Sequence, residues 1–180
     1  AGPRVNGRVA EIPAKRAGTA LSVYDMDKRG KLWYNTPYYG RLCPEEESGM
    51  GKLIVFEGTD GSGKATQSAL LCQELEKRGI AFRKLEFPRY QEESSALIRL
   101  YLGGAFGSDP DDVNAYAAST FYSVDRYASY KQDWGGFYEA GGLLIADRYT
   151  TSNAVHQTGK LPPEKRDAFL DWLFDFEYHL

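Results

Sequence analysis

Short apolar runs alternate along this chain with longer segments whose apolar residues recur every three or four positions. The apolar runs, bounded by glycine, proline or charged residues as buried strands are, cover residues 53–56, 81–87 and 143–146. Segments with helical spacing begin near residues 63, 94, 110, 152 and 164. Strands that alternate with helices predict an α/β fold with a parallel sheet covered on both faces.

The apolar positions also predict which side of each helix is buried. In the helix after the first strand, the inward residues are Ala69, Leu70, Leu71 and Leu75, and Gly79 fits a helix C-terminus. In the long helix from about Pro110 to Lys131, the packed face is Val113, Ala117, Thr120, Phe121, Val124 and Ala128. In the last helix, the inward residues are Phe169, Trp172, Leu173 and Phe176.

The first predicted strand runs directly into a glycine-rich sequence that ends in Lys64. Gly58-x-x-x-x-Gly63-Lys64 is the pattern of a phosphate-binding loop, in which glycines let backbone N–H groups curl around an anion. The following helix adds the positive end of its dipole, and Lys64 adds a mobile cation. The alternative is an ordinary glycine-rich loop, but the strand before it and the helix after it favour phosphate binding.

The residue after Lys64 departs from this pattern. A serine or threonine there would contact magnesium, but the chain has Ala65, and Thr66 points about 100° away around the helix. We therefore expect a metal ion to be held through water, phosphate oxygens and a carboxylate from elsewhere in the chain.

Charged and aromatic residues follow the other two predicted strands, in the segments 87–90 and 147–149. Because ligands of parallel sheets bind at the carboxyl ends of the strands, all three strand ends are expected to converge on one cleft. Arg148 can grip a phosphate with two N–H groups, and Asp147 can hold magnesium or its water shell. A surface ion pair at a strand terminus is the alternative.

Tyr122 and Arg126 are four residues apart on the long predicted helix, so they share one face. They fit a ring that stacks on a base and a guanidinium that hydrogen-bonds to it. A tyrosine stacked on its own arginine at a solvent-facing seam, worth about 0.5–1 kcal/mol, explains the spacing equally well. The spacing alone leaves both interpretations open.

Composition narrows the class of protein. The formal net charge of the 180 residues is −3 at pH 7, so we expect no broad basic surface and no nucleic-acid partner. Two cysteines are too few for a disulfide framework. No apolar run approaches the roughly 20 residues of a membrane span, and no signal peptide is visible. These features favour a cytoplasmic protein with no membrane partner.

The first 49 residues differ in charge from the rest. They carry eight basic and six acidic residues, whereas residues 50–180 carry 14 and 19. The shift falls at Met50, so we predict that residues 1–49 are an N-terminal extension or upstream segment of unknown role. Residues 23–24 and 31–34 within it fit a hairpin.

Four motifs together resemble the thymidylate kinase family. They are Phe56-Glu-Gly-Thr-Asp-Gly-Ser-Gly-Lys64, Phe87-Pro-Arg-Tyr90, Tyr122-x-x-x-Arg126 and Asp147-Arg-Tyr-x-x-Ser-Asn153. The resemblance covers residues 50–180 and about the first two-thirds of the family's length. It implies a P-loop NTPase-like three-layer fold, and a Mg²⁺-dependent transfer of the γ-phosphoryl group of ATP to dTMP, giving dTDP for dTTP synthesis.

The resemblance also implies roles for individual residues. The ATP phosphates would lie on Gly58, Asp60, Gly61, Ser62, Gly63, Lys64, Ala65 and Thr66. The residues that would bind dTMP are Asp60, Phe87, Pro88, Tyr122, Arg126, Arg148, Asn153 and His156. Within that set, Asp60 would contact the sugar 3′-hydroxyl, and His156 stands where the family often has tyrosine or phenylalanine near the 2′ position. Lys64, Arg148 and Asp147 would act in catalysis, with Asp147 in the magnesium network.

The resemblance further implies a homodimer, together with a basic lid and two more strands after Leu180. Without those strands, we expect the Leu53–Phe56 edge of the sheet to be unpaired and prone to association. The alternatives are a deoxynucleoside kinase, which shares the loop and an arginine-bearing strand end, and an inactive nucleotide-binding fragment.

Overall fold

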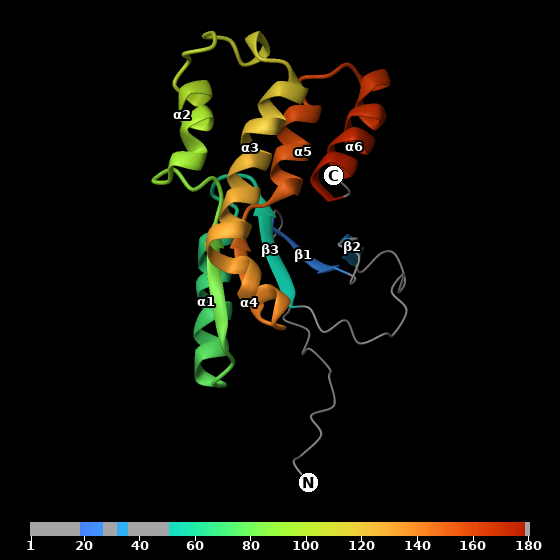
Figure 1. The fold of residues 1–180 in the computed structure, drawn as a ribbon. Coiled ribbons are helices and arrows are strands. Elements are labelled where there is room, and N and C mark those ends of the chain that lie inside the picture. Colours follow the sequence, from blue (N-terminus) through green and yellow to red (C-terminus); the bar gives the residue numbers. More distant parts are fainter. Residues whose placement is uncertain (1–18, 27–31, 36–50, 179–180) are drawn as a thin grey trace.

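The computed structural model describes residues 19–26, 32–35 and 51–178, which form a sheet, the helices against it and a helical layer at one end (Figure 1). The strands are β1 (Thr19–Met26), β2 (Leu32–Asn35), β3 (Lys52–Gly58), β4 (Phe82–Glu86) and β5 (Leu143–Asp147). The helices are α1 (Lys64–Lys77), α2 (Ala96–Leu102), α3 (Ala115–Ser129), α4 (Gly135–Glu139), α5 (Thr150–Thr158) and α6 (Pro163–Tyr178). Short 3₁₀ turns cover Glu93–Ser95 and Pro110–Asp112, and a π-helical turn, Tyr130–Trp134, joins α3 to α4.

The described part of the sheet has the strand order β2-β1-β3-β5-β4. The three strands predicted from apolar runs, β3, β4 and β5, are parallel, with β5 between the other two. The predicted α/β class is therefore confirmed, and the carboxyl ends of three parallel strands meet at one edge of the sheet.

The segment before Met50 adds two antiparallel strands to this sheet. β1 and β2 form the predicted hairpin, and β1 also pairs with β3, placing Tyr24 opposite Leu53 and Leu21 opposite Phe56. The prediction of an unpaired Leu53–Phe56 edge is therefore wrong. The physical reason is that an antiparallel strand can satisfy the backbone groups of β3 without any crossover helix.

Helices cover the sheet on both faces because residues of β3 alternate in direction. On one face, Phe56 of β3 and Ile145 of β5 pack with Leu75 of α1. On the other face, the buried cluster is Leu53, Val55, Leu85, Phe87, Trp134, Tyr138, Leu144 and Ala146, which joins the sheet to the π-helical turn and α4. This two-sided burial fixes the strand ends that carry the candidate site.

Two predictions of buried helix faces are wrong in part. In α1, Leu70 is 53% exposed, whereas Ser68 is fully buried. In α3, Val124 is 51% exposed, and the buried face is instead mostly small and polar, consisting of Ala115, Ala118, Ser119, Ser123, Asp125, Arg126 and Ser129. The apolar pattern misleads for α3 because its inner face makes buried hydrogen bonds and ion pairs rather than apolar contacts.

Helices α2, α3, α5 and α6 stand beyond the carboxyl ends of the parallel strands (Figure 1). As predicted, Phe169 and Leu173 of α6 face inward, where they pack with Ala115 of α3 and Ala154 of α5. The predicted long helix is divided near its start, because Asn114 caps α3 by accepting a 2.9 Å hydrogen bond from the Ala117 N–H.

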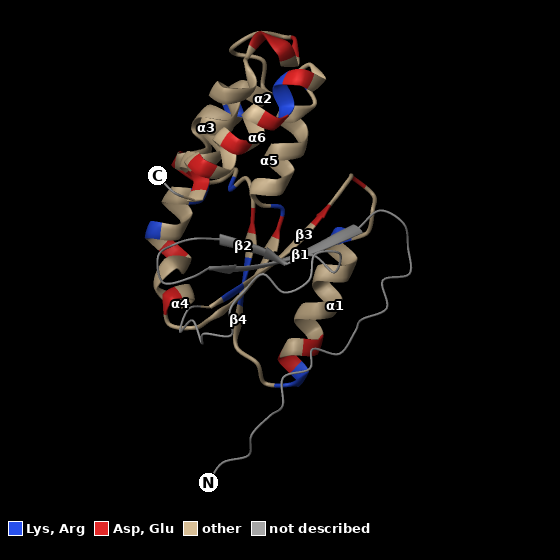
Figure 2. Ribbon diagram, turned by 90° about the vertical axis from the view of Figure 1, so that its right-hand side faces the viewer, with Lys and Arg blue, Asp and Glu red and all other residues tan. Residues whose placement is uncertain are grey.

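Basic and acidic residues are interspersed over the described helices, as Figure 2 shows. Within the described ranges, the helices are all too short or too polar to cross a membrane.

Candidate active site

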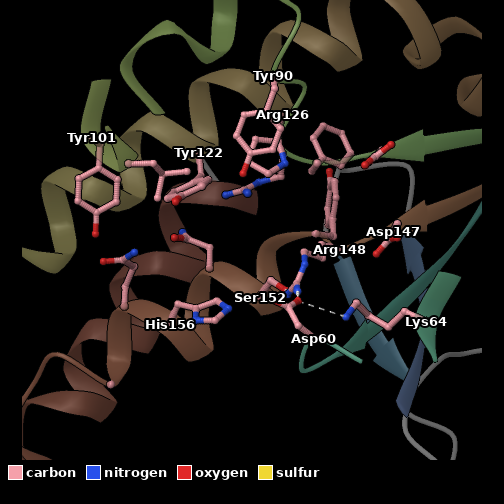
Figure 3. A pocket seen from close by; sticks show the side chains of 18 of the residues that line it. Asp60, Lys64, Tyr90, Tyr101, Tyr122, Arg126, Asp147, Arg148, Ser152 and His156 are labelled. Atoms are coloured by element: carbon pink, nitrogen blue, oxygen red, sulfur yellow. Dashed lines mark hydrogen bonds and ion pairs between the residues drawn. The ribbon is translucent and has the colours of Figure 1, made fainter. Parts of the chain in front are cut away.

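A cavity of about 1160 Å³ lies where the carboxyl ends of β3, β4 and β5 meet the helical layer (Figure 3). Its lining includes the glycine-rich loop after β3, the segment after β4 and the Asp147–Tyr149 segment that ends β5. Residues of α3 and α5 close the other side. The predicted convergence of three strand ends on one cleft is confirmed.

The glycine-rich loop has the backbone that its sequence predicts. Gly61 and Gly63 have φ angles of 77° and 93°, a region that favours glycine. A Cβ atom added to either glycine would meet no described atom within 4 Å, so the loop borders open space. Since α1 begins at Lys64, its first N–H groups lack intrahelical partners and are available at the same place. The loop therefore fits an anion.

Lys64 is held inside this loop rather than extended into solvent. Its Nζ donates 2.9 Å hydrogen bonds to the carbonyl oxygens of Gly58 and Thr59, and its side chain is only 9% exposed. Asp60 lies 4.0 Å away and is 96% exposed. The ammonium charge is thus fixed at the mouth of the loop.

Arg148 spans the space between the loop and α5 (Figure 3). Its Nη2 donates a 2.6 Å hydrogen bond to Asp60, and its Nη1 donates a 3.1 Å hydrogen bond to Ser152. The backbone of Arg148 has a φ of 65°, which is uncommon for a residue with a side chain. The Arg148 N–H donates a 3.1 Å hydrogen bond to the Phe56 carbonyl, which holds this conformation in place.

Glu57, at the end of β3, ties the loop segment to the start of α5. Its carboxylate is buried and accepts 3.1 Å hydrogen bonds from the backbone N–H groups of Tyr149 and Ser152, and a further one from the Ser152 hydroxyl. The strand that leads into the phosphate-binding loop therefore also fixes the segment that carries Arg148.

Asp125 performs a similar task for the segment after β4. Only 1% exposed, it accepts a 2.8 Å hydrogen bond from the Arg89 backbone N–H and a 2.6 Å one from the Ser94 hydroxyl. The Phe87–Pro88 peptide bond in this segment is cis. α3 thereby anchors the loop that presents Phe87 and Pro88 to the cavity.

Tyr122 and Arg126 both line the cavity, and Arg126 is buried, which excludes a solvent-facing seam as the explanation of their spacing. Burial raises the pKa of Tyr122 to about 12, so its phenol stays neutral at ordinary pH. Burial alone would lower the pKa of Arg126, but the Glu177 carboxylate outweighs this effect and raises it. The guanidinium also lies 5.8 Å from the centre of the Tyr149 ring. Arg126 is therefore a buried cation and not part of a solvent-facing seam.

Asn153 and Gln157 of α5 bring unpaired polar atoms to this cavity. Both amide atoms of Asn153, which is 5% exposed, and the Gln157 carbonyl oxygen have no hydrogen-bond partner among the described residues. Buried polar atoms are normally paired, so these are available to a polar ligand.

Comparison with known proteins gives this site a family. The family model described as thymidylate kinase matches residues 56–164, more than half of the chain. The chain belongs to the thymidylate kinase family. It is 35% identical over 107 residues to a thymidylate kinase of Nostoc punctiforme, an alignment that covers 59% of this chain and 49% of the relative. It is 34% identical over 117 residues to a thymidylate kinase of a Cyanothece species, covering 59% and 50%.

A solved structure of thymidylate kinase from Candida albicans has a similar fold. The TM-score is 0.54 at 25% sequence identity, and the match covers 70% of this chain and 56% of that one. The chain spans about half the length of the curated relatives it matches. All four motifs of the thymidylate kinase pattern lie within residues 56–164, the range that the family model matches.

The structure brings most of the predicted site residues together. The cavity lining includes Asp60, Gly61, Gly63, Lys64, Ala65, Thr66, Phe87, Pro88, Tyr122, Arg126, Asp147, Arg148, Asn153 and His156. Two predicted residues of the thymidylate kinase loop, Gly58 and Ser62, are outside this lining. The carboxylates of Glu57, Asp125 and Glu177, which no sequence motif singled out, also hold this site in place. Glu57 directly follows the apolar run of the first strand and Asp125 directly precedes Arg126, but neither position marks the carboxylate as buried, and Glu177 carries no such signal.

Proposed function

We propose that this protein is an ATP-dependent dTMP kinase that transfers the γ-phosphoryl group of ATP to dTMP and releases dTDP for dTTP synthesis. One observation carries the proposal: a phosphate-binding loop and a pocket of aromatic and amide side chains open into the same cavity, with Arg148 between them. Phosphoryl transfer needs two phosphates brought in line, and such a cavity can hold both nucleotides end to end.

The phosphate end of the cavity would bind ATP through the loop. The open glycine backbone and the first N–H groups of α1 would hold the anionic oxygens, and Lys64 would leave its carbonyl partners to neutralise charge that develops in transfer. Arg148 would exchange Asp60 for the dTMP phosphate, because a guanidinium fork matches phosphate geometry. Asp60, once released, would accept from the sugar 3′-hydroxyl.

The other end of the cavity would bind thymine. Phe87, Pro88 and Tyr122 offer flat apolar surfaces, and a neutral phenol at Tyr122 repels no electron-rich base edge. Asn153 carries an unpaired donor and an unpaired acceptor. Thymine presents an N–H donor flanked by carbonyl acceptors, so Asn153 and the donor Arg126 would together satisfy its edge. His156 would lie near the sugar 2′ position.

Magnesium fits this site only with help from the nucleotide. Among the described residues, no cluster of three or more His, Cys, Asp or Glu side chains could hold a metal ion. Asp147 lines the cavity, and Mg²⁺ in kinases is commonly held by one or two carboxylates, phosphate oxygens and water. A bound Mg²⁺ would neutralise the phosphate oxygens during transfer. Asp147 would hold it directly or through its water shell.

The oligomeric state and the cellular location are proposed from those of the thymidylate kinase family. A homodimer formed through the helices is supported by exposed apolar side chains on α3 and α5, where Tyr127 is 65% and Val155 67% exposed. A cytoplasmic protein is supported by the free thiol of Cys72. Residues 50–180 would be the nucleoside monophosphate kinase domain, and residues 1–49 an extension that contributes β1 and β2.

The acceptor specificity of the protein, in the length that its gene encodes, tests this proposal. ADP release in the presence of ATP should be much faster with dTMP than with dCMP, AMP or thymidine. Equal or faster turnover of thymidine would instead make the protein a deoxynucleoside kinase. ATP binding with no acceptor-dependent ADP release would make it an inactive nucleotide-binding protein.

A further inference from the structure

The buried side of Arg126 is occupied by a carboxylate from a distant helix. Glu177, near the end of α6, accepts a 3.1 Å hydrogen bond from Arg126 Nε and a second one from Arg126 Nη2. The two side chains are 5% and 6% exposed, so water reaches neither well. A two-pronged contact of this kind fixes both the position and the plane of a guanidinium.

Two further contacts limit how the guanidinium can turn. The Ser123 hydroxyl donates a 2.5 Å hydrogen bond to Glu177, and it accepts a weaker one of 3.5 Å from Arg126 Nη2. The Tyr149 ring lies 5.8 Å from the guanidinium carbon, and Tyr149 in turn packs edge-on against Phe87, with 5.5 Å between ring centres. The edge and the face of Arg126 are therefore both held.

One nitrogen of Arg126 remains for a ligand. Nε and Nη2 donate to Glu177 and Ser123, which leaves Nη1 outside this network. Arg126 lines the cavity beside Tyr122, as Figure 3 shows. Because a guanidinium only donates, Nη1 can satisfy an acceptor such as a base carbonyl but not an amino group.

The carboxylate also changes what Arg126 attracts. A lone buried arginine is a strong site for phosphate, which would draw the nucleotide into the cavity the wrong way round. Arg126 stays charged, but together with the Glu177 carboxylate it forms a pair that is close to neutral as a whole, and so its remaining nitrogen suits the uncharged edge of a base. The separate arginine at 148, whose Asp60 partner is exposed, remains the better phosphate ligand.

We infer that Glu177 is a positioning residue of the base pocket, which holds Arg126 so that its Nη1 reads a carbonyl oxygen of the nucleotide base. The inference rests on the proposed dTMP kinase function. It predicts that Glu177 sets the preference for thymine, which has a carbonyl at C4, over cytosine, which has an amino group there.

The test compares Glu177→Gln with a control in which Glu164→Gln changes an exposed acid on the same helix. In the full protein, E177Q should raise the KM for dTMP roughly tenfold or more, the usual scale for a lost polar contact to a substrate. The KM for ATP should stay within about twofold, and the ratio of kcat/KM for dTMP over dCMP should fall. E164Q should match wild type.

A role in folding alone would lower the activity with dTMP and dCMP together and leave their ratio unchanged, which would overturn the inference. A lower KM for dTMP would also overturn it, because Glu177 would then compete with the base for Arg126. If wild type itself does not turn over dTMP, the proposed function fails first. If E177Q does not fold, Glu177→Asp decides: it keeps the charge but displaces the guanidinium, so an unchanged KM for dTMP and unchanged ratio would refute the positioning role.

A double-mutant cycle gives an independent readout. If Glu177 acts through Arg126, E177Q should change dTMP binding, measured by calorimetry, far less in an Arg126→Met background than in wild type. Additive effects of the two substitutions would mean that Glu177 acts by another route.

Discussion

Replacing Glu57 should reveal how strongly one buried carboxylate holds the site together. The side chain accepts from the Tyr149 N–H, the Ser152 N–H and the Ser152 hydroxyl, and it is 7% exposed. Glu57→Ala would leave two partly buried backbone N–H groups without this acceptor. Each such group costs about 1–3 kcal/mol, so E57A should lower the free energy of unfolding by about 2–6 kcal/mol.

Glu57→Gln should have a smaller effect. Its carbonyl oxygen can still accept from both N–H groups, and the Ser152 hydroxyl can rotate to accept from the new amide. Only the charge assistance is lost, which amounts to roughly 1–2 kcal/mol. Because typical domains are stable by only about 5–15 kcal/mol, both changes should be measurable.

Urea unfolding followed by circular dichroism measures these differences as shifts in midpoint at constant slope. Glu76→Gln, an exposed acid on α1, is the matched control and should stay within about 0.5 kcal/mol of wild type. The expected order of stability is wild type, then E57Q, then E57A. An E57A protein as stable as E76Q would show that Glu57 does not hold the segment of Arg148.

Three further predictions concern the phosphate ligands, the tyrosine pocket and the sheet edge. Lys64→Ala and Arg148→Ala should each lower turnover at least tenfold, because a charge-assisted contact contributes about 1.5–3 kcal/mol. The thermal midpoints of both variants should stay near that of the wild type. Near-normal turnover of either variant would show that the assigned role of that residue is wrong. The raised pKa of Tyr122, about 12 against 10.0, means that the folded state keeps the proton longer than the unfolded one, so stability is complete below pH 10 and falls between pH 10 and 12. Tyr122→Phe should reduce that fall in urea titrations at pH 8 and 11, and an identical fall would show that Tyr122 is not buried in solution. Removing residues 1–49 should leave the Leu53–Phe56 edge open and cause self-association in size-exclusion chromatography, which a monodisperse product would contradict.

The sequence predicted the parallel core of the fold because its signals are local. An apolar run that ends in Gly58-x-x-x-x-Gly63-Lys64 allows few conformations, and the structure has the strand, the left-handed glycines and the helix in that order. The strand ends meet because parallel strands must share an edge. Both facts follow from spacing alone.

The parts that the sequence did not predict depend on distant partners. The hydrogen-bond donors to Glu57 lie 92 and 95 positions later in the chain, and the arginine that pairs with Glu177 lies 51 positions before it. No local pattern marks a carboxylate as buried, since burial requires donors that only the fold supplies. The exposed Val124 has a similar origin, because the inner face of α3 was assigned by apolarity while polar side chains occupy it.

The pairing of β1 with β3 was missed for a different reason. The hairpin was predicted from residues 23–24 and 31–34, but an edge strand carries no sequence mark of the strand that it joins. The convergence of the strand ends on one cavity was predicted, whereas the pairing of the sheet edge was not, because four motifs mark the strand ends and only hydrogen bonding constrains an edge.

The identity of the phosphorylated product decides whether this protein is a dTMP kinase. The protein, in the length that its gene encodes, is incubated with γ-labelled ATP, Mg²⁺ and dTMP, and the labelled nucleotides are separated. We predict that the label moves to dTDP at a rate that depends on dTMP, and that Arg148→Ala removes most of that transfer. Label that stays in ATP or appears only as free phosphate would contradict this prediction.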